Sequence, residues 1–202
     1  MADTKAEHTI LITNARLSYA YLFKPYKGDD GKSSYCAHSI ISPTHPVLPA
    51  FTALVRAVAA EEYKDKAEEV LMQIKAQDKL CIHRGDVSKP GQDAYRGMLY
   101  ISANNSIKPR LVATINGVNQ EVDESSEFAP YSGCIANVIL RIWAQNHTKW
   151  GKRINAELQG VQFVKHAERL GGGGRAASLD EFGVVAGDAD SAAPEQGGGG
   201  LI

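Results

Sequence analysis

The sequence has little of what would assign a protein class at once. Its 202 residues include three cysteines, Cys36, Cys81 and Cys134, which lie far apart. An odd and scattered set argues against a disulfide scaffold and favours a reducing compartment, with cysteine used as a small apolar residue. No apolar run approaches the roughly 20 residues that span a bilayer, and MADTKAEHT at the start lacks a signal-peptide pattern. We therefore expect a cytoplasmic protein without a membrane partner.

Motifs for catalysis and cofactor binding are also missing. The chain has no Walker loop, GxGxxG, HExxH or nucleophile elbow, and no Lys-Ser/Thr follows its GGGG runs. We expect no enzyme, no cofactor and no metal. Two weaker interpretations stay open. The Cys-X-His pairs at 36–38 and 81–83 could together bind zinc, although this spacing is unusual for zinc. Asp78, Asp86 and Asp93 could serve a metal-dependent nuclease, although their spacing matches no metal motif.

The net charge of −1 hides a division of the chain. Residues 171–202 carry one basic and five acidic residues, which leaves 21 of the 22 basic and 18 of the 23 acidic residues before them. Glycine, alanine and acids dominate after residue 169, so we predict a folded domain over 1–169 and a flexible acidic tail over 170–202. The tail is either an inert solubilising segment or a ligand for replication or recombination proteins. Its candidate partner-binding residues are Phe182, Leu201 and Ile202.

The most informative stretch, Tyr131–His166, consists of two strand-like runs joined by a polar, basic link. Successive side chains of a strand point to opposite faces. One face of the first run is apolar: Cys134, Ala136, Val138, Leu140, Ile142 and Ala144. The other face holds Ile135, Asn137, Ile139, Arg141, Trp143 and Gln145. The pattern predicts a long β-hairpin with one face in the core and a cation beside an indole on the other.

The rest of the chain predicts short strands around one helical segment. Strands are expected at His8–Tyr21, Tyr35–Ser42, Tyr95–Asn104 and Leu111–Ile115. One broken helix or two helices are expected between about Pro46 and Ala76, where apolar residues recur at helical spacing. The remaining segments are expected to be loops or turns: 22–34, 78–92, Asn116-Gly117 and the acidic 121–127.

Short strands with polar loops predict a mainly β protein with a helical insertion. The OB-fold, a five-stranded barrel, is the version whose open face binds single strands of nucleic acid. In such a face, cations neutralise phosphates and aromatic rings stack on bases for about 1–3 kcal/mol each. The candidate stacking rings are Trp143, Trp150 and Tyr100, with packing in the core or at a sheet edge as the alternative for each. The other candidate binding residues are Arg96, Arg141, Lys149, Lys152, Arg153, Phe23, Lys24, Tyr26, Lys27, Lys108 and Arg110.

Four segments, in order along the chain, resemble a known family. They are TNARLSYAYLFKP from Thr13, YSGC from Tyr131, LQGVQFV from Leu158 and LGGGG…LDEFG from Leu170. Together they resemble a family of phage single-stranded DNA-binding proteins, Enc34-phage-like and once a domain of unknown function, similar in role to the T7-type binders. The resemblance implies an OB-fold and sequence-independent binding of single-stranded DNA in phage replication or recombination. It implies no particular DNA-contacting residue.

Two alternatives to a simple DNA-binding protein stay open from the residues. The first is the metal-dependent nuclease built on Asp78, Asp86 and Asp93. The second is a strand-annealing or scaffold protein that works through oligomerisation, and homo-oligomer formation is left open. The terminal GGGGLI also departs from the acidic, Phe-ending tips of bacterial single-strand binders.

Overall fold

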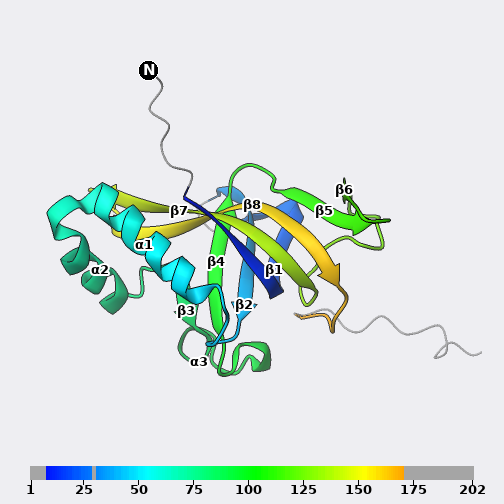
Figure 1. Cartoon of the computed structure of the whole chain (residues 1–202), viewed down its shortest axis with the longest axis horizontal. Helices are drawn as coiled ribbons and strands as arrows, with labels where there is room; N and C mark the ends of the chain where they lie inside the picture. Colours follow the sequence, from blue (N-terminus) through cyan, green and yellow to red (C-terminus); the bar gives the residue numbers. More distant parts are fainter. Residues whose placement is uncertain (1–7, 29–30, 171–202) are drawn as a thin grey trace, which may run out of the picture. The chain divides into compact units, whose positions relative to one another are not determined.

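The computed structural model describes residues 8–28 and 31–170 (Figure 1). The boundary predicted between 169 and 170 stays a prediction. Leu170 is the last described residue, and its backbone N–H donates to the carbonyl of Ser132. The candidate partner-binding residues of the tail lie outside the described residues: Phe182, Leu201 and Ile202.

The chain begins with two antiparallel strands, β1 (Thr9–Lys27) and β2 (Ser33–Ile41). The prediction that the first strand ends at Tyr21 is wrong, because β1 runs for 19 residues and takes in half of the expected loop. Its register with β2 shifts between Ser18 and Tyr21 and again before Tyr26. Such bulges bend a strand and raise its twist, so β1 can follow a curved path. The sequence pattern gave no sign of them.

The helical segment follows β2 as expected, in two pieces. Helix α1 (Leu48–Tyr63) has proline in its first turn and buries Phe51, Val55 and Val58 on one face. Proline is tolerated there because the first backbone N–H groups of a helix have no partner inside it. Lys64 has a φ of 53°, which ends α1, and a short 3-10 turn (Lys64–Lys66) leads into α2 (Ala67–Ala76).

The segment after α2 is more regular than predicted. It contains β3 (Ile82–Arg84), a single helical turn α3 (Gly85–Ser88) and a 3-10 turn η2 (Asp93–Tyr95). Strand β4 (Leu99–Asn105) then begins four residues later than expected, so Arg96 is not part of it. Long-range packing of Tyr95, which is 1% exposed, stabilises this segment.

The remaining strands agree with the sequence pattern, except that no strand was predicted after Asn116-Gly117. Strand β5 (Arg110–Ile115) and β6 (Val118–Glu121) are joined by Asn116-Gly117, with φ values of 52° and 79°. Two positive φ values match the type I′ turn that Asn-Gly favours between paired strands. The long hairpin is confirmed as β7 (Ile135–His147) and β8 (Gly151–Lys165).

The described residues form an eight-stranded sheet that closes on itself. The order is β3-β4-β2-β1-β7-β8-β5-β6, and β4 also pairs with β8 in parallel. This last pairing closes a ring of five strands: β1, β2, β4, β8 and β7. Strands of this ring cross one another in the centre of Figure 1. The predicted OB-fold barrel with a helical insertion is therefore confirmed. In this part of the chain no helix is long and apolar enough to cross a membrane.

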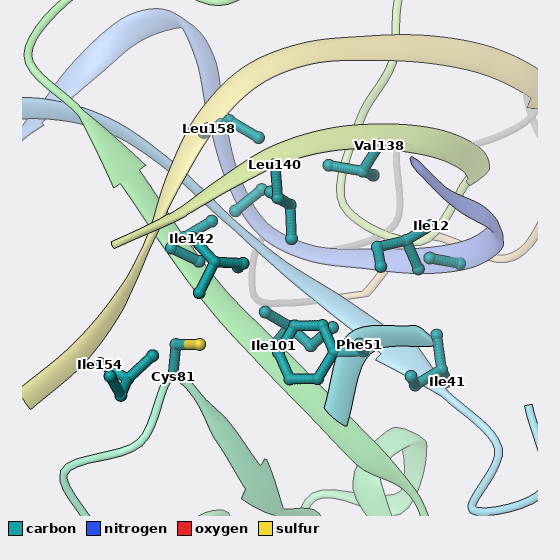
Figure 2. Close-up of a cluster of buried hydrophobic side chains, with 14 of the residues drawn as sticks. Ile12, Ile41, Phe51, Cys81, Ile101, Val138, Leu140, Ile142, Ile154 and Leu158 are labelled. Carbon is teal, nitrogen blue, oxygen red and sulfur yellow. The ribbon is translucent and has the colours of Figure 1, made fainter. Parts of the chain in front are cut away.

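The barrel interior is filled by the apolar faces of its strands. Val138, Leu140 and Ile142 are at most 1% exposed, which confirms the predicted core face of the hairpin. Figure 2 shows these side chains with Leu158 of β8 above Ile101 of β4, and Phe51 of α1 closing the space below. Full burial of each such side chain contributes roughly 1.5–3 kcal/mol. Cys81 and Cys134 are buried among these residues and Cys36 is half-buried, all as free thiols.

The turn before β7 is held between β1 and the end of the described chain. Gly133 donates its N–H to the carbonyl of Leu17, and it has a φ of 117°. A Cβ at this position would overlap the backbone of Glu168 and Arg169. Tyr131 donates its hydroxyl to the carbonyl of Ala167, 2.8 Å away. The YSGC segment therefore fixes the course of the chain that follows β8.

Gly133→Ala should destabilise the fold more than the same change at Gly91, which also has positive φ but has open space around it. The left-handed backbone alone costs an alanine about 1–2 kcal/mol, and overlap with backbone atoms adds to that at residue 133. We expect urea titration to give a loss of about 1 kcal/mol for Gly91→Ala and at least about 3 kcal/mol for Gly133→Ala. Equal losses would show that the 167–170 segment does not pack here in solution.

Candidate nucleic-acid interface

The tip of the β7–β8 hairpin forms a projecting basic loop, which we call the finger (residues 146–153). Its turn is organised by His147, whose Nδ1 accepts the backbone N–H groups of Lys149 at 3.1 Å and Trp150 at 3.3 Å. Trp150 is 60% exposed, and the Lys149 ammonium lies 5.0 Å from its ring centroid. The structure therefore presents the predicted cation and indole together and open to solvent.

The base of the finger is anchored on helix α1. The hydroxyl of Tyr63 donates toward the carbonyls of Gln145 at 2.8 Å and Arg153 at 3.1 Å, on opposite strands. Burial raises the pKa of the Tyr63 phenol, so it stays protonated as a donor. The Lys152 ammonium lies 5.5 Å from the Tyr63 ring, on the helix side of the hairpin. In Figure 1 the ends of β7 and β8 lie beside α1.

The outer face of β7 carries the predicted arginine and tryptophan. Trp143 is 37% exposed, and Arg141 is exposed two residues before it, so both point away from the core as expected. Arg141 also pairs with Glu157 across the hairpin, with Nε and Oε2 3.4 Å apart. Arg153 is the cross-strand partner of Gln145 and shares this face.

Tyr100 and Arg96 do not form the predicted pair on one strand. Arg96 lies in the turn before β4 and pairs with Asp93, and both side chains are largely exposed. Tyr100 does point away from the barrel core, but it is only 5% exposed. His38 and His83 stack on its ring, and Tyr95 packs edge-on against it. Its ring therefore has no open face for a base, which sequence alternation alone could not reveal.

Several predicted cations lie against the acidic segment 121–127. Lys24 pairs with Glu124 at 3.1 Å, and Arg110 pairs with Glu121 at 3.1 Å. The Lys108 ammonium lies 5.5 Å from the ring of Phe23. The sequence predicted a loop for Phe23, Lys24, Tyr26 and Lys27, but all four lie on β1. The acidic segment therefore lies beside these cations and pairs with two of them.

A tyrosine-rich surface lies on β1, and of its three rings only Tyr26 was predicted as a binding residue. Tyr19, Tyr21 and Tyr26 are 38%, 41% and 44% exposed, and the rings of Tyr21 and Tyr26 are 5.1 Å apart. Tyr21 pairs with Cys36 of β2, a strand whose outer face also carries His38. We call Tyr19, Tyr21 and Tyr26 the tyrosine face. The alternation of Tyr19 and Tyr21 with Ala20 was the available signal, but the strand was expected to end there.

OB-folds bind oligonucleotides across their second and third strands, with the loops after the first and fourth strands. In this barrel the second and third strands along the chain are β2 and β4. The corresponding loops are the β1–β2 connection, of which 29–30 are not described, and the finger. Tyr26 and Lys27 lie at the first loop, and Lys149 and Trp150 lie at the second. The geometry combines rings with cations at both ends of a barrel face.

The three aspartates of the nuclease hypothesis have separate local partners. Asp78 Oδ1 accepts a hydrogen bond from His83 Nδ1, 2.9 Å away, and Asp86 accepts the N–H of Gly97 at 2.9 Å. Asp93 pairs with Arg96. Among residues 8–28 and 31–170 no group of three or more His, Cys, Asp or Glu side chains is arranged to hold a metal ion. These carboxylates have evident roles in local turns.

Comparison with known proteins gives consistent matches. The sequence model of the family described as Enterobacter phage Enc34, ssDNA-binding protein, matches residues 8–193. Putative protein p50 of Acyrthosiphon pisum secondary endosymbiont phage 1 is 29% identical over 177 residues, which is 86% of this chain and 91% of that protein.

Solved structures are similar as well. The single-stranded DNA-binding protein from bacteriophage Enc34 in complex with ssDNA superposes with a TM-score of 0.69 at 28% identity, covering 82% of this chain and 91% of that one. The single-stranded DNA-binding protein gp2.5 of bacteriophage T7 gives a TM-score of 0.54 at 14% identity, covering 79% and 93%. The second likeness concerns the fold alone.

His147→Ala should loosen the finger turn while leaving the barrel intact. It removes the acceptor for two backbone N–H groups, each worth about 0.5–1.5 kcal/mol, so their amides should exchange about 2- to 10-fold faster. His147→Asn is the matched control, because an asparagine Oδ1 accepts the N–H two residues on. Hydrogen exchange by NMR at Lys149 and Trp150 measures both variants. Unchanged exchange in His147→Ala would mean that the turn does not depend on the imidazole.

Proposed function

The chain belongs to the family of the Enterobacter phage Enc34 ssDNA-binding protein, and on that premise we propose that it binds single-stranded DNA without sequence preference. By coating single strands it would protect them during phage DNA replication or recombination, in the cytoplasm of the host. The observation that carries the proposal is the closed barrel with exposed rings and cations at both ends of one face. Its supporting residues are the tyrosine face and the finger.

Two interactions would contribute to the binding free energy, one with the phosphates and one with the bases. Cations release counterions when they neutralise phosphates, so affinity falls with salt, by a slope of roughly −0.7 for each contacted phosphate of a single strand. Exposed rings stack on bases with little regard for base identity, because every base has a π-face. Trp150 and Lys149 supply both interactions within one exposed turn. Trp143 and Arg141 extend the same combination along β7.

The ion pairs with the acidic segment are compatible with this function. Lys24 with Glu124 and Arg110 with Glu121 are exposed on both sides, with side chains at least 60% accessible. Such surface pairs contribute at most about 1 kcal/mol, so a DNA phosphate can replace the carboxylate. These cations therefore remain part of the proposed interface, with a smaller net contribution to the binding free energy. Lys108, near Phe23, remains part of it as well.

The proposed function involves no catalysis. The family is one of binding proteins, and the candidate aspartates support turns in the structure. Single-stranded DNA incubated with the protein and Mg²⁺ should therefore stay intact by gel electrophoresis. Shortened DNA that an Asp86→Ala variant no longer produces would establish the nuclease instead.

Addition of oligo-dT should quench the fluorescence of the two tryptophans, and the affinity should fall as salt increases. A salt series with dT, mixed-sequence DNA and RNA oligomers gives the number of phosphates contacted and the preferred nucleic acid. Absence of both quenching and a mobility shift at low salt would overturn the proposed function.

The variant Trp150→Ala tests the stacking component in the same titration, followed by fluorescence anisotropy of labelled oligomers. It should weaken binding to dT, dA and mixed sequences to a similar degree, by up to about 1–3 kcal/mol for one lost stack. Trp150→Phe is the matched control, because it keeps a ring at the tip of the finger. A loss confined to one base would contradict sequence-independent stacking.

A further inference from the structure

Tyr19 occupies a backbone conformation that bulky side chains avoid. Its φ is 48°, within the left-handed region, and the register of β1 with β2 shifts between Ser18 and Tyr21. A bulky residue at positive φ is an outlier that persists only when surrounding contacts enforce it. A bulge inserts an extra residue and changes the direction of its side chain. Here the ring is brought to the outer face of β1 with 38% of the residue exposed.

The Tyr19 ring is the outer member of a stack of aromatic rings. Its centroid lies 4.9 Å from that of His38, with the two rings tilted by 52°. His38 in turn stacks on Tyr100 at 4.7 Å, with 28° between the planes. Tyr100 in turn stacks on His83 at 5.0 Å. The stack runs from β1 through β2 and β4 to β3, across paired strands. A ring supported in this way is already ordered before any ligand arrives.

The middle of the stack is fixed by hydrogen bonding. Nδ1 of His38 lies 2.8 Å from the hydroxyl of Tyr95, which is 1% exposed. Burial, with the nearby charges of Lys89 and His83, lowers the pKa of His38 to about 4. The imidazole is therefore neutral near pH 7, and Tyr19 packs at a tilt against an uncharged ring.

Two polar side chains from the segment between β3 and β4 reach the outer ring. The Lys89 ammonium lies 4.5 Å from the Tyr19 ring centroid, and Gln92 donates its amide Nε2–H to the Tyr19 hydroxyl at 2.9 Å. Lys89 follows helix α3, and Gln92 precedes the turn that carries Tyr95. An exposed ring, a cation on the ring and a polar amide at its edge thus come together at one point.

We propose that Tyr19 and Lys89 form a subsite for one nucleotide of single-stranded DNA, with Tyr19 stacking on the base and Lys89 binding the adjacent phosphate. The subsite rests on the proposed function and lies on the barrel, on a different element from the finger. The ammonium leaves the ring for the phosphate as the base takes its place on the exposed part of Tyr19. Because the stack orders the ring in advance, little side-chain entropy is lost on binding.

The strain at Tyr19 favours a binding role over plain packing. A ring needed only to cover the sheet would be buried, as Tyr95 and Tyr100 are at 1% and 5% exposure. Tyr19 keeps more than a third of its surface open in spite of its unfavourable φ. Strained residues of this kind cluster at ligand sites, where the surrounding structure enforces them.

The test compares variants of the full-length chain by anisotropy titration with fluorescent oligo-dT. Tyr19→Gly removes the ring and accepts the positive φ without strain, so it should fold and bind about 5- to 150-fold more weakly, the loss of one base stack. Tyr19→Phe is the matched control: it keeps the stack and loses only the hydrogen bond from Gln92, so its affinity should stay within about twofold. Urea midpoints check that both variants remain folded.

Lys89→Ala should reduce the salt slope of binding by about 0.7, the contribution of one phosphate, whereas Tyr19→Gly should leave the slope unchanged. Lys75→Ala is the matched control, because Lys75 lies in the last turn of α2 and outside the proposed subsite. A structural role for either residue would change the urea midpoint and not the slope.

The outcomes separate the two proposals. If the wild-type chain does not bind oligo-dT, the proposed function itself fails. If the wild type binds while Tyr19→Gly binds equally tightly, or Lys89→Ala keeps the full slope, the subsite is wrong and the proposed function stands. If Tyr19→Phe loses as much affinity as Tyr19→Gly, the effect belongs to the hydroxyl group, and stacking by Tyr19 is also overturned.

Discussion

The short parallel pairing between β4 and β8 is the contact on which the rest of the fold depends. It joins Ala103 to Ala156 and Asn104 to Glu157, and it closes the ring of strands. Closure separates a dry interior from an outer face on which polar and aromatic side chains stay accessible. It also requires β1 to curve between β2 and β7, which its two bulges permit. The exposed tyrosines of β1 are thus linked to the geometry that closes the barrel.

The helical insertion connects this barrel to the finger. Phe51 of α1 closes one end of the core, while Tyr63 at the other end of the same helix binds carbonyl groups of both hairpin strands. A hairpin extending past its barrel would otherwise be free to bend, because a two-stranded ribbon is only marginally stable by itself. The helix therefore gives the basic, aromatic tip a defined base, beyond which His147 organises the turn.

Much of this could be predicted from local pattern, and the failures share a cause. Strict alternation predicted the β7–β8 hairpin and its core face, and Asn116-Gly117 predicted the turn between β5 and β6, because period and turn chemistry are local properties. The bulges of β1, the cover over Tyr100 and the stack behind Tyr19 depend on residues distant in sequence. Tyr100 is covered because Tyr95, His38 and His83, none of them on its own strand, pack on its ring. Local pattern therefore predicted which side chains of the hairpin are exposed, and it failed to predict exposure on β1 and β4.

The placement of the last barrel strand has a consequence for synthesis of the chain. Strand β1 receives its second neighbour only when β7 is made, and Ala103 of β4 meets its partner Ala156 only when β8 follows. Until then both strands present unpaired edges and an uncovered apolar face, features that promote association between nascent chains. Contacts between such distant segments also slow folding. The helices α1 and α2, already complete at that stage, each carry a buried apolar face that can shield the open sheet before the hairpin arrives.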